Sequence, residues 1–300
     1  TGATDSTTAM TNAVAAAKAS GANGLHIPRG KYRITAGAIA LSQIAIHGVG
    51  VQEASTPYND AGTVFLFDSI LASPFTLGRQ VTIEGCAFYW PDQTDANATP
   101  IAYPPLFTGT YITQFNFHDN TVINAYDFLK VTTGGIGIGD NSIRNNRIYA
   151  INRCFHFLNG APESMWISDN LFSWAPYEDV VNAGPNYYLR NYTANSGEFM
   201  RIDVGAGSYT LMDGLFLTDN LILGPRYGVR VVTGSLNVSK IQSNTFDAVG
   251  TWLSVEGTAK LLNSLISSNY LYCYNISDAT TAAAGMSLTS TGALSDVTVI

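Results

Sequence analysis

The stretch "FLTDNLIL", residues 216 to 223, places an aspartate and an asparagine between apolar residues on both sides. Such short polar side chains bond to nearby backbone and favour turns, so they are rare inside strands. The same pattern, apolar-x-x-Asn-x-apolar, recurs along the chain. Its asparagines are Asn120, Asn146, Asn170, Asn220, Asn244 and Asn269. The stretch is therefore one copy of a repeat.

The spacing of these asparagines indicates a repeat of about 25 residues. Successive steps are 26, 24, 50, 24 and 25 residues. The step of 50 predicts two repeats, with one further asparagine between Asn170 and Asn220. Asn195 fits that gap by arithmetic, whereas Asn191 fits the strand pattern that follows it. A fixed repeat of this length is typical of solenoids and related arrays.

Each repeat holds two or three short runs rich in Val, Ile, Phe and Tyr, broken by Gly, Asn, Asp, Ser and Pro. These runs are strand and turn signals, and no long amphipathic helical pattern interrupts them. We therefore predict an all-β parallel β-helix, in which each strand stacks about 4.8 Å above the strand one coil earlier. The repeated asparagines would then stack on one another at one turn. The alternative is that they are ordinary loop asparagines in unrelated strands.

The N-terminal part differs from the repeats. In residues 5 to 21, Asp5 can cap a helix with an apolar face of Met10, Val14 and neighbouring alanines, which Gly21 would end. Such a helix can cover the open end of a solenoid. The stretches "GLHIPRGKYRI" (24 to 34) and "IAIHGVGV" (44 to 51) follow it.

This opening resembles the pectate-lyase-like superfamily of right-handed parallel β-helices, in the form found in bacteriophage tailspikes and polysaccharide depolymerases. The resemblance covers residues 2 to about 50 by motif and the remainder by repeat pattern. It implies a right-handed single-stranded β-helix with an N-terminal capping α-helix, an extracellular or virion-surface location, and a homotrimer. Because "ALSDVTVI" ends in mid-pattern, we expect the native chain to continue past Ile300.

Three regions are expected along the chain: a cap and first coils (1–50), irregular coils with inserted loops (51–111), and regular coils (112–300). The inserted loops carry Tyr89, Trp90 and Tyr103, with Asp92 and Asp95 nearby. Such residues could form a sugar-binding wall. They could equally pack on the flank of the solenoid or on a neighbouring subunit.

Composition restricts the partners and cofactors. A net charge of −7 and only 12% charged residues argue against a nucleic-acid binder. No apolar run is long enough to cross a membrane, so no membrane insertion is expected. Cys86, Cys154 and Cys273 are widely spaced. We expect buried thiols, no metal site and no cofactor.

The repeat also predicts which side chains face outward. Nine residues after each asparagine, Leu129, Phe155, Val229 and Leu253 should face inward, so the next residues, Lys130, His156, Arg230 and Ser254, should face out. With Asn191 as the missing ladder residue, Met200 faces inward and Arg201 joins the outward row. This row could hold an acidic polysaccharide by ion pairs. Alternatively, it is a solvated face whose charges are stacked by chance or paired with acids.

Carboxylates near this row suit glycoside hydrolysis, which needs an acid and a base or nucleophile. Asp179, or Glu178, with Asp203 is the expected catalytic pair. The remaining residues expected to bind substrate are Lys130, His156, Arg201, Arg230, Trp252, Glu256 and Trp90. The alternative chemistry is β-elimination from a uronic acid, for which Lys130, His156, Arg201 and Arg230 are suited.

Known catalytic signatures are missing from the sequence. It lacks the Asn-Thr-Asp, Asp-Asp and Gly-His-Gly motifs of polygalacturonases, the Arg-x-Pro-x-x-Arg of pectate lyases and the Tyr-Gly-x-Asp-Pro-His of alginate epimerases. The sequence thus leaves two function classes: a glycan-cleaving enzyme, or a non-enzymatic β-helix that acts as an adhesin or spacer.

Overall fold

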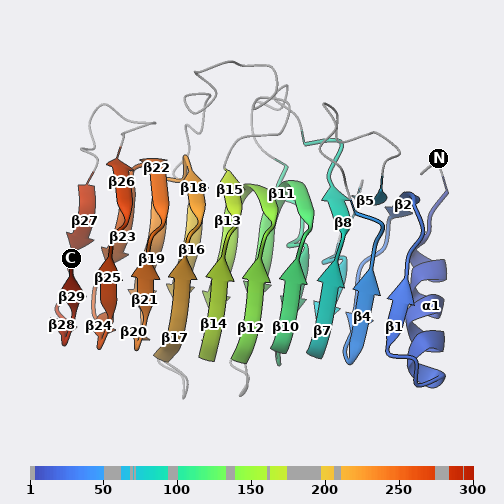
Figure 1. Ribbon diagram of the computed structural model, residues 1–300, viewed down its shortest axis with the longest axis horizontal. Coiled ribbons are helices and arrows are strands. Elements are labelled where there is room, and N and C mark those ends of the chain that lie inside the picture. Colours follow the sequence, from blue (N-terminus) through green and yellow to red (C-terminus); the bar gives the residue numbers. More distant parts are fainter. Residues whose placement is uncertain are drawn as a thin grey trace.

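The apolar runs of the repeats form short parallel strands that stack side by side along one axis, as a computed structural model shows (Figure 1). The structure describes residues 4–50, 62–67, 70, 72–93, 101–132, 139–160, 163–173, 197–205, 211–273, 284–292 and 294–300. Strand pairing connects each coil to the next over this whole length, so the predicted parallel β-helix is confirmed.

Each coil contributes strands to three faces, which we number in chain order. The first face is a 13-stranded sheet. Its strands are β1 (Gly24–His26), β4 (Ile44–His47), β7 (Arg79–Glu84), β10 (Thr113–His118), β12 (Gly139–Arg144), β14 (Glu163–Ser168), β17 (Leu211–Thr218), β20 (Ser235–Asn237), β21 (Lys240–Gln242), β24 (Lys260–Leu262), β25 (Leu265–Ser267), β28 (Leu294–Ser295) and β29 (Thr298–Val299).

The other two faces share a 16-stranded sheet, because two of its strands bend from one face into the next. The second face contains β2 (Gly30–Ile34), β5 (Thr63–Phe67), β8 (Cys86–Tyr89), the first halves of β11 (Thr121–Val131) and β13 (Arg147–Leu158), β15 (Leu171–Ser173), β18 (Leu221–Leu223), β22 (Thr245–Val249) and β26 (Tyr270–Cys273). The third face contains β3 (Ile39–Leu41), β6 (Phe75–Leu77), β9 (Phe107–Gly109), the second halves of β11 and β13, β16 (Glu198–Asp203), β19 (Tyr227–Thr233), β23 (Thr251–Val255) and β27 (Ala284–Leu288).

The predicted asparagine ladder lies at the turn between the first and second faces. Asn146 shows its bonding: Nδ2 donates to Asn170 Oδ1 (2.9 Å), to Phe117 O and to Arg144 O (both 2.8 Å). The Asn146 backbone N–H also donates to Asn170 Oδ1, at 2.9 Å. The same contacts join Asn220 to Asn244. Each ladder amide thus supplies the turn with the partners that its buried backbone groups require.

The residue before each ladder asparagine has a left-handed backbone. Asp119, Asp169 and Asp219 have φ values of 57°, 58° and 57°. Short polar residues tolerate this conformation better than bulky ones do. The repeated Asp-Asn pairs of the sequence are therefore structural.

The prediction of a further ladder residue between Asn170 and Asn220 is wrong. Asn170 Nδ2 donates directly to Asn220 Oδ1 at 2.9 Å, and β15 pairs with β18. By strand pairing, the step of 50 residues therefore corresponds to one enlarged coil instead of two ordinary ones. Asn191 and Asn195, the two residues considered for that rung, lie outside the described part of the chain.

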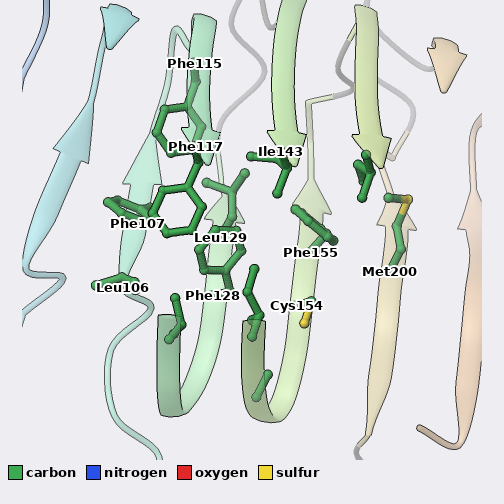
Figure 2. Close-up of a cluster of buried hydrophobic side chains, with 14 of the residues drawn as sticks. Leu106, Phe107, Phe115, Phe117, Phe128, Leu129, Ile143, Cys154, Phe155 and Met200 are labelled. Atoms are coloured by element: carbon green, nitrogen blue, oxygen red, sulfur yellow. The ribbon is translucent and has the colours of Figure 1, made fainter. Parts of the chain in front are cut away.

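Aromatic side chains from successive coils fill the interior (Figure 2). Phe107, Phe128 and Phe155 contact one another edge to face, with ring centroids 5.5 and 5.7 Å apart. The predicted inward residues Leu129, Phe155, Met200, Val229 and Leu253 lie in register on neighbouring strands and are all buried. Cys86 and Cys154 are buried free thiols, as expected.

Helix α1 (Thr7–Ala19) covers the N-terminal end of the solenoid, as predicted (Figure 1). Its buried side chains include Met10, Val14 and Ala17. Asp5 Oδ1 accepts hydrogen bonds from the Thr7 N–H (2.9 Å) and hydroxyl (2.6 Å), which lower the pKa of Asp5 to about 2. The helix contacts β1, β3 and β4, so it shields the first coil.

Candidate functional site

The third face carries the predicted row of outward side chains. Strand pairing places Lys130 beside His156, His156 beside Arg201, and Arg201 beside Arg230, with Ser254 next. These five residues, from β11, β13, β16, β19 and β23, form what we call the charged row. The repeat predicted that these residues lie in register in one outward row, and the strand pairing confirms the register. Arg201 belongs to the enlarged coil, so it directly follows His156 with no coil between them.

A buried carboxylate at Glu198 connects the arginines of this face. Its side chain is only 1% exposed. It forms ion pairs with Arg153 Nε, with Arg230 Nη1 at 2.7 Å and with Arg201 Nη1 at 3.4 Å. Burial alone would raise the pKa of Glu198, but these arginines lower it. Glu198 is therefore ionised and holds three guanidinium groups together.

Glu198 was not predicted from the sequence, because the repeat was used only for the outward positions ten residues after each ladder asparagine. It precedes Arg201 by three residues, as Asp127 precedes Lys130 and Arg153 precedes His156. Strand pairing places Asp127, Arg153 and Glu198 side by side in that order. The signal was an alternation of charge at the position seven residues after the ladder asparagines, at Asp127 and Arg153.

Arg230 is the most strongly paired cation of the charged row. Its Nε and Nη2 bind Glu256 Oε1 and Oε2 at 2.8 and 3.1 Å, and Ser254 donates to the same carboxylate at 2.7 Å. Its guanidinium also lies 4.4 Å from the centre of the Tyr227 ring. Burial opposes ionisation of Glu256, but the bonds from Arg230 and Ser254 lower its pKa. Arg230 and Glu256 thus hold each other in fixed positions.

Asp203 is also ion-paired. Its Oδ2 accepts from Arg201 Nη2 at 3.0 Å, and its Oδ1 accepts from the Thr233 hydroxyl at 3.0 Å. Burial would raise the pKa of Asp203, but these hydrogen bonds lower it. Asp203 is therefore an ionised carboxylate at neutral pH and can serve as a base or nucleophile, not as a proton donor.

His156 differs from its neighbours because its polar atoms have no partner among the described residues. The side chain is 7% exposed, and neither ring nitrogen makes a hydrogen bond in the described part of the chain. Burial, followed by the positive charges of Arg153, Lys130 and Arg201, lowers its pKa to about 4. His156 is thus a neutral imidazole beside several cations. A buried polar atom without a partner costs about 1–3 kcal/mol in stability.

Asp127 is the carboxyl of this site whose pKa burial raises. It is 4% exposed and accepts a hydrogen bond from Asn152 Nδ2 at 2.7 Å. Lys130, next to it on β11, forms no ion pair with the described residues. The site therefore combines ionised carboxylates, a carboxyl whose pKa is raised by burial, a neutral imidazole and an ammonium without an ion pair among the described residues.

The two tryptophans predicted to bind substrate lie in the core. Trp90 is fully buried, and its ring centroid lies 4.6 Å from that of Phe67. Trp252 is 2% exposed, and its ring centroid lies 5.7 Å from that of Phe246. Neither presents a ring to a sugar, so both assignments are corrected. Tyr89 and Tyr103 are buried as well, so these aromatic residues pack on the solenoid.

Three further expectations concern the remaining acidic residues, a metal site and a membrane span. Glu178, Asp179 and Asp95 lie outside the described residues. Within the described ranges, no cluster of His, Cys, Asp and Glu side chains has the arrangement of a metal site. The described helix, α1, has neither the length nor the apolar character to span a membrane.

Comparisons with known proteins reveal no family model and no curated protein that matches this chain. Among solved structures, the A-modules of the Azotobacter vinelandii mannuronan C-5 epimerases AlgE6 and AlgE4 are similar in fold. Their identities to this chain are 16% and 17%, and both have a TM-score of 0.45. The matches cover 89% of this chain and 74% and 75% of those chains. Similarity at this level carries no information about the reaction.

Proposed function

We propose that this protein binds an acidic polysaccharide along the third face and cleaves it. The observation that carries the proposal is the charged row, in which Lys130, His156, Arg201 and Arg230 occur on four neighbouring strands of one outward face. Lysine binds carboxylates by ion pairs, and arginine also by forked hydrogen bonds. Among the described residues, Lys130 has no ion-pair partner and the ring nitrogens of His156 have no hydrogen-bond partner.

Hydrolysis is the first candidate reaction. One carboxylate must activate water or attack the sugar, and a protonated carboxyl must donate to the leaving oxygen. The ion pair with Arg201 suits Asp203 to the first role, because it keeps the carboxylate ionised. Asp179 or Glu178 remains the proposed proton donor. Glu256 would act indirectly, by fixing Arg230.

Elimination is the second candidate, with His156 as the proposed base. In β-elimination a base removes the proton next to the carboxylate of a uronic acid, and the bond to the leaving sugar oxygen then breaks. A neutral imidazole can accept that proton. Lys130 and Arg201, which flank His156 in the row, could neutralise the substrate carboxylate as charge develops.

The resemblance of the first 50 residues to tailspikes supports a more specific proposal. We propose a homotrimeric depolymerase, located on a virion surface or outside the cell, that acts on a bacterial capsule or surface glycan. A non-enzymatic adhesin or spacer with the same face is the competing function.

The test is incubation with bacterial capsular polysaccharides, lipopolysaccharides, polygalacturonate and alginate. New reducing ends without the ultraviolet absorbance of an unsaturated uronate would support hydrolysis. New absorbance would support elimination, and retention without cleavage would support an adhesin. Asp203→Asn should abolish hydrolysis and His156→Gln should abolish elimination, whereas the control Asp247→Asn, on the second face, should change neither. Cleavage unchanged in both site variants would contradict these assignments.

A further inference from the structure

The first face carries a second outward row that the proposed function does not use. Strand pairing places polar side chains on β7, β10 and β12, then two aromatic rings on β14 and β17, and then a lysine on β21. In order, these residues are Thr82, Asn116, Ser142, Trp166, Phe216 and Lys240. We call them the aromatic row. Its strands lie side by side along the solenoid (Figure 1).

The indole of Trp166 is exposed and held in a fixed orientation. It stacks on Phe216 with ring centroids 5.4 Å apart and an angle of 9° between the planes, yet 42% of Trp166 remains exposed. Phe216 covers one face of the indole. The other face lies toward β12, where the residue in register is Ser142. Because a serine side chain is small, the position that would continue the stack of rings is open.

A polar hollow lies on the side of Trp166 toward β12 and the strands before it, which is the side of the open indole face. Its volume is about 370 Å³, and its lining residues are Gln80, Thr82, Gln114, Asn116 and Asp140. Thr82 and Asn116 belong to the aromatic row, and Asp140 is on β12, as is Ser142. The described lining residues offer amides, a hydroxyl and a carboxylate but no cation. The hollow therefore suits a ligand that is rich in hydroxyl groups and has no negative charge.

We propose that the aromatic row is a binding site for a neutral saccharide, separate from the charged row. One sugar ring lies over Ser142, with the apolar C–H face of the pyranose against the free face of Trp166. Its hydroxyls and those of the next sugar form hydrogen bonds with Asn116 and Asp140 in the hollow. Apolar stacking combined with a few placed polar groups is the general pattern of small-ligand sites.

The two rows differ in the charge that they favour. The charged row contains Lys130, Arg201 and Arg230, whereas Asp140 is the only ionisable side chain among the described residues that line the hollow. An anionic sugar would meet a like charge there. The neutral-saccharide site is independent of the proposed reaction, and each can fail while the other stands.

Two variants of opposite kind test the site. Trp166→Ala removes the stacking surface, and Ser142→Phe places a ring in the open position. Binding of cellohexaose, maltohexaose and chitohexaose is measured by calorimetric titration and by tryptophan fluorescence. We expect at least one hexasaccharide to bind, each variant to weaken that binding at least tenfold, and Trp166→Phe to retain part of it.

Matched controls separate this site from other effects. Asp247→Asn, on the second face, and Lys18→Ala, on helix α1, should change the dissociation constant less than twofold. Circular dichroism and thermal unfolding show that each variant is folded. Binding of none of the three sugars, or binding unchanged in both Trp166→Ala and Ser142→Phe, would overturn the proposal. So would sedimentation showing that Trp166→Ala dissociates an oligomer, because the face would then be a subunit interface.

Discussion

The asparagine ladder and the charged row both run along this solenoid, and they differ in how their buried polar atoms are satisfied. In the asparagine ladder, the side chain of Asn170 donates to Asn220, to Ile143 O and to Ser168 O, and its oxygen accepts from Asn146. In the charged row, His156 is nearly as buried, yet both ring nitrogens lack a partner in the described structure. Regular repetition alone therefore does not distinguish a structural row from a functional one.

What distinguishes the two rows is whether the chain completes its own hydrogen bonds. A polar group that is satisfied within the fold contributes to stability, whereas one left unsatisfied costs stability. Glu198 lies between these cases, because it is satisfied by arginines that the charged row also uses. Substitutions in each row should therefore affect stability and ligand binding in different proportions.

The largest expected loss of stability is for Glu198→Gln. Removing this charge leaves Arg153 and Arg230 without their shared buried partner. Breaking a buried ion pair costs about 3–5 kcal/mol in the free energy of unfolding. Denaturant unfolding measures it. The control Glu256→Gln, at a carboxylate whose side chain is 26% exposed, should cost about 1 kcal/mol or less. Equal losses in the two variants would contradict the central role of Glu198.

A slightly smaller loss is expected for Asn170→Ala in the ladder. The variant leaves Ile143 O without its side-chain donor and the Asn146 N–H without its acceptor. Such buried orphan groups cost about 2–4 kcal/mol together. Asn269→Ala, at the partly exposed last rung, should cost about half as much by the same unfolding measurement. A larger effect at Asn269 would show that the ladder is not the main support of the turns.

Acidification should reveal His156 as a source of stability change. Its pKa is about 4 in the folded chain against 6.5 for the unfolded chain, so between these values the unfolded state binds more protons. Stability should therefore fall by roughly 2–3 kcal/mol as pH drops from 7 to 4.5. The His156→Gln variant should lose less stability over that range. Burial of Asp127 contributes with the opposite sign, but this contribution is common to both proteins and cancels in the comparison. Parallel pH profiles for the two proteins would show that His156 is not buried and neutral.

The smallest effect on stability should come from Lys130→Ala. Lys130 has no ion pair among the described residues, so we expect a change within about 0.5 kcal/mol. The affinity of the variant for an acidic polysaccharide should nevertheless fall about tenfold, because the variant lacks the ammonium that would bind a substrate carboxylate. A stability loss that matches the affinity loss would place Lys130 with the structural residues.

The sequence predicted the fold and the register of the charged row, because both follow from one repeat. The asparagine spacing places Lys130 beside His156 and Arg230 beside Ser254 without any other information. Arg201 was predicted correctly, but from a ladder residue that does not exist. An enlarged coil restores the register through strand pairing that no spacing rule reveals.

The errors at Trp90 and Trp252 have a common origin in local geometry. Simple alternation predicts that Trp252 faces outward because Leu253 faces inward. Where the coil bends into the third face, however, two consecutive residues face inward, as Phe128 and Leu129 also do. Trp90 alternates in phase with the inward Phe88, although a Pro-rich polar segment follows it. Bends and loop boundaries are tertiary features, so alternation could not identify these exceptions.

The most direct test of the central claim compares an acidic and a neutral polysaccharide on the wild type and the Lys130→Ala/His156→Gln double variant. The account predicts that the wild type binds polygalacturonate or alginate with an affinity that falls as salt rises. The double variant should stay folded and bind at least tenfold more weakly, with affinity for neutral hexasaccharides unchanged. Undiminished binding of the acidic polymer by the folded double variant, or no binding by the wild type, would contradict the assignment of the charged row as a glycan site.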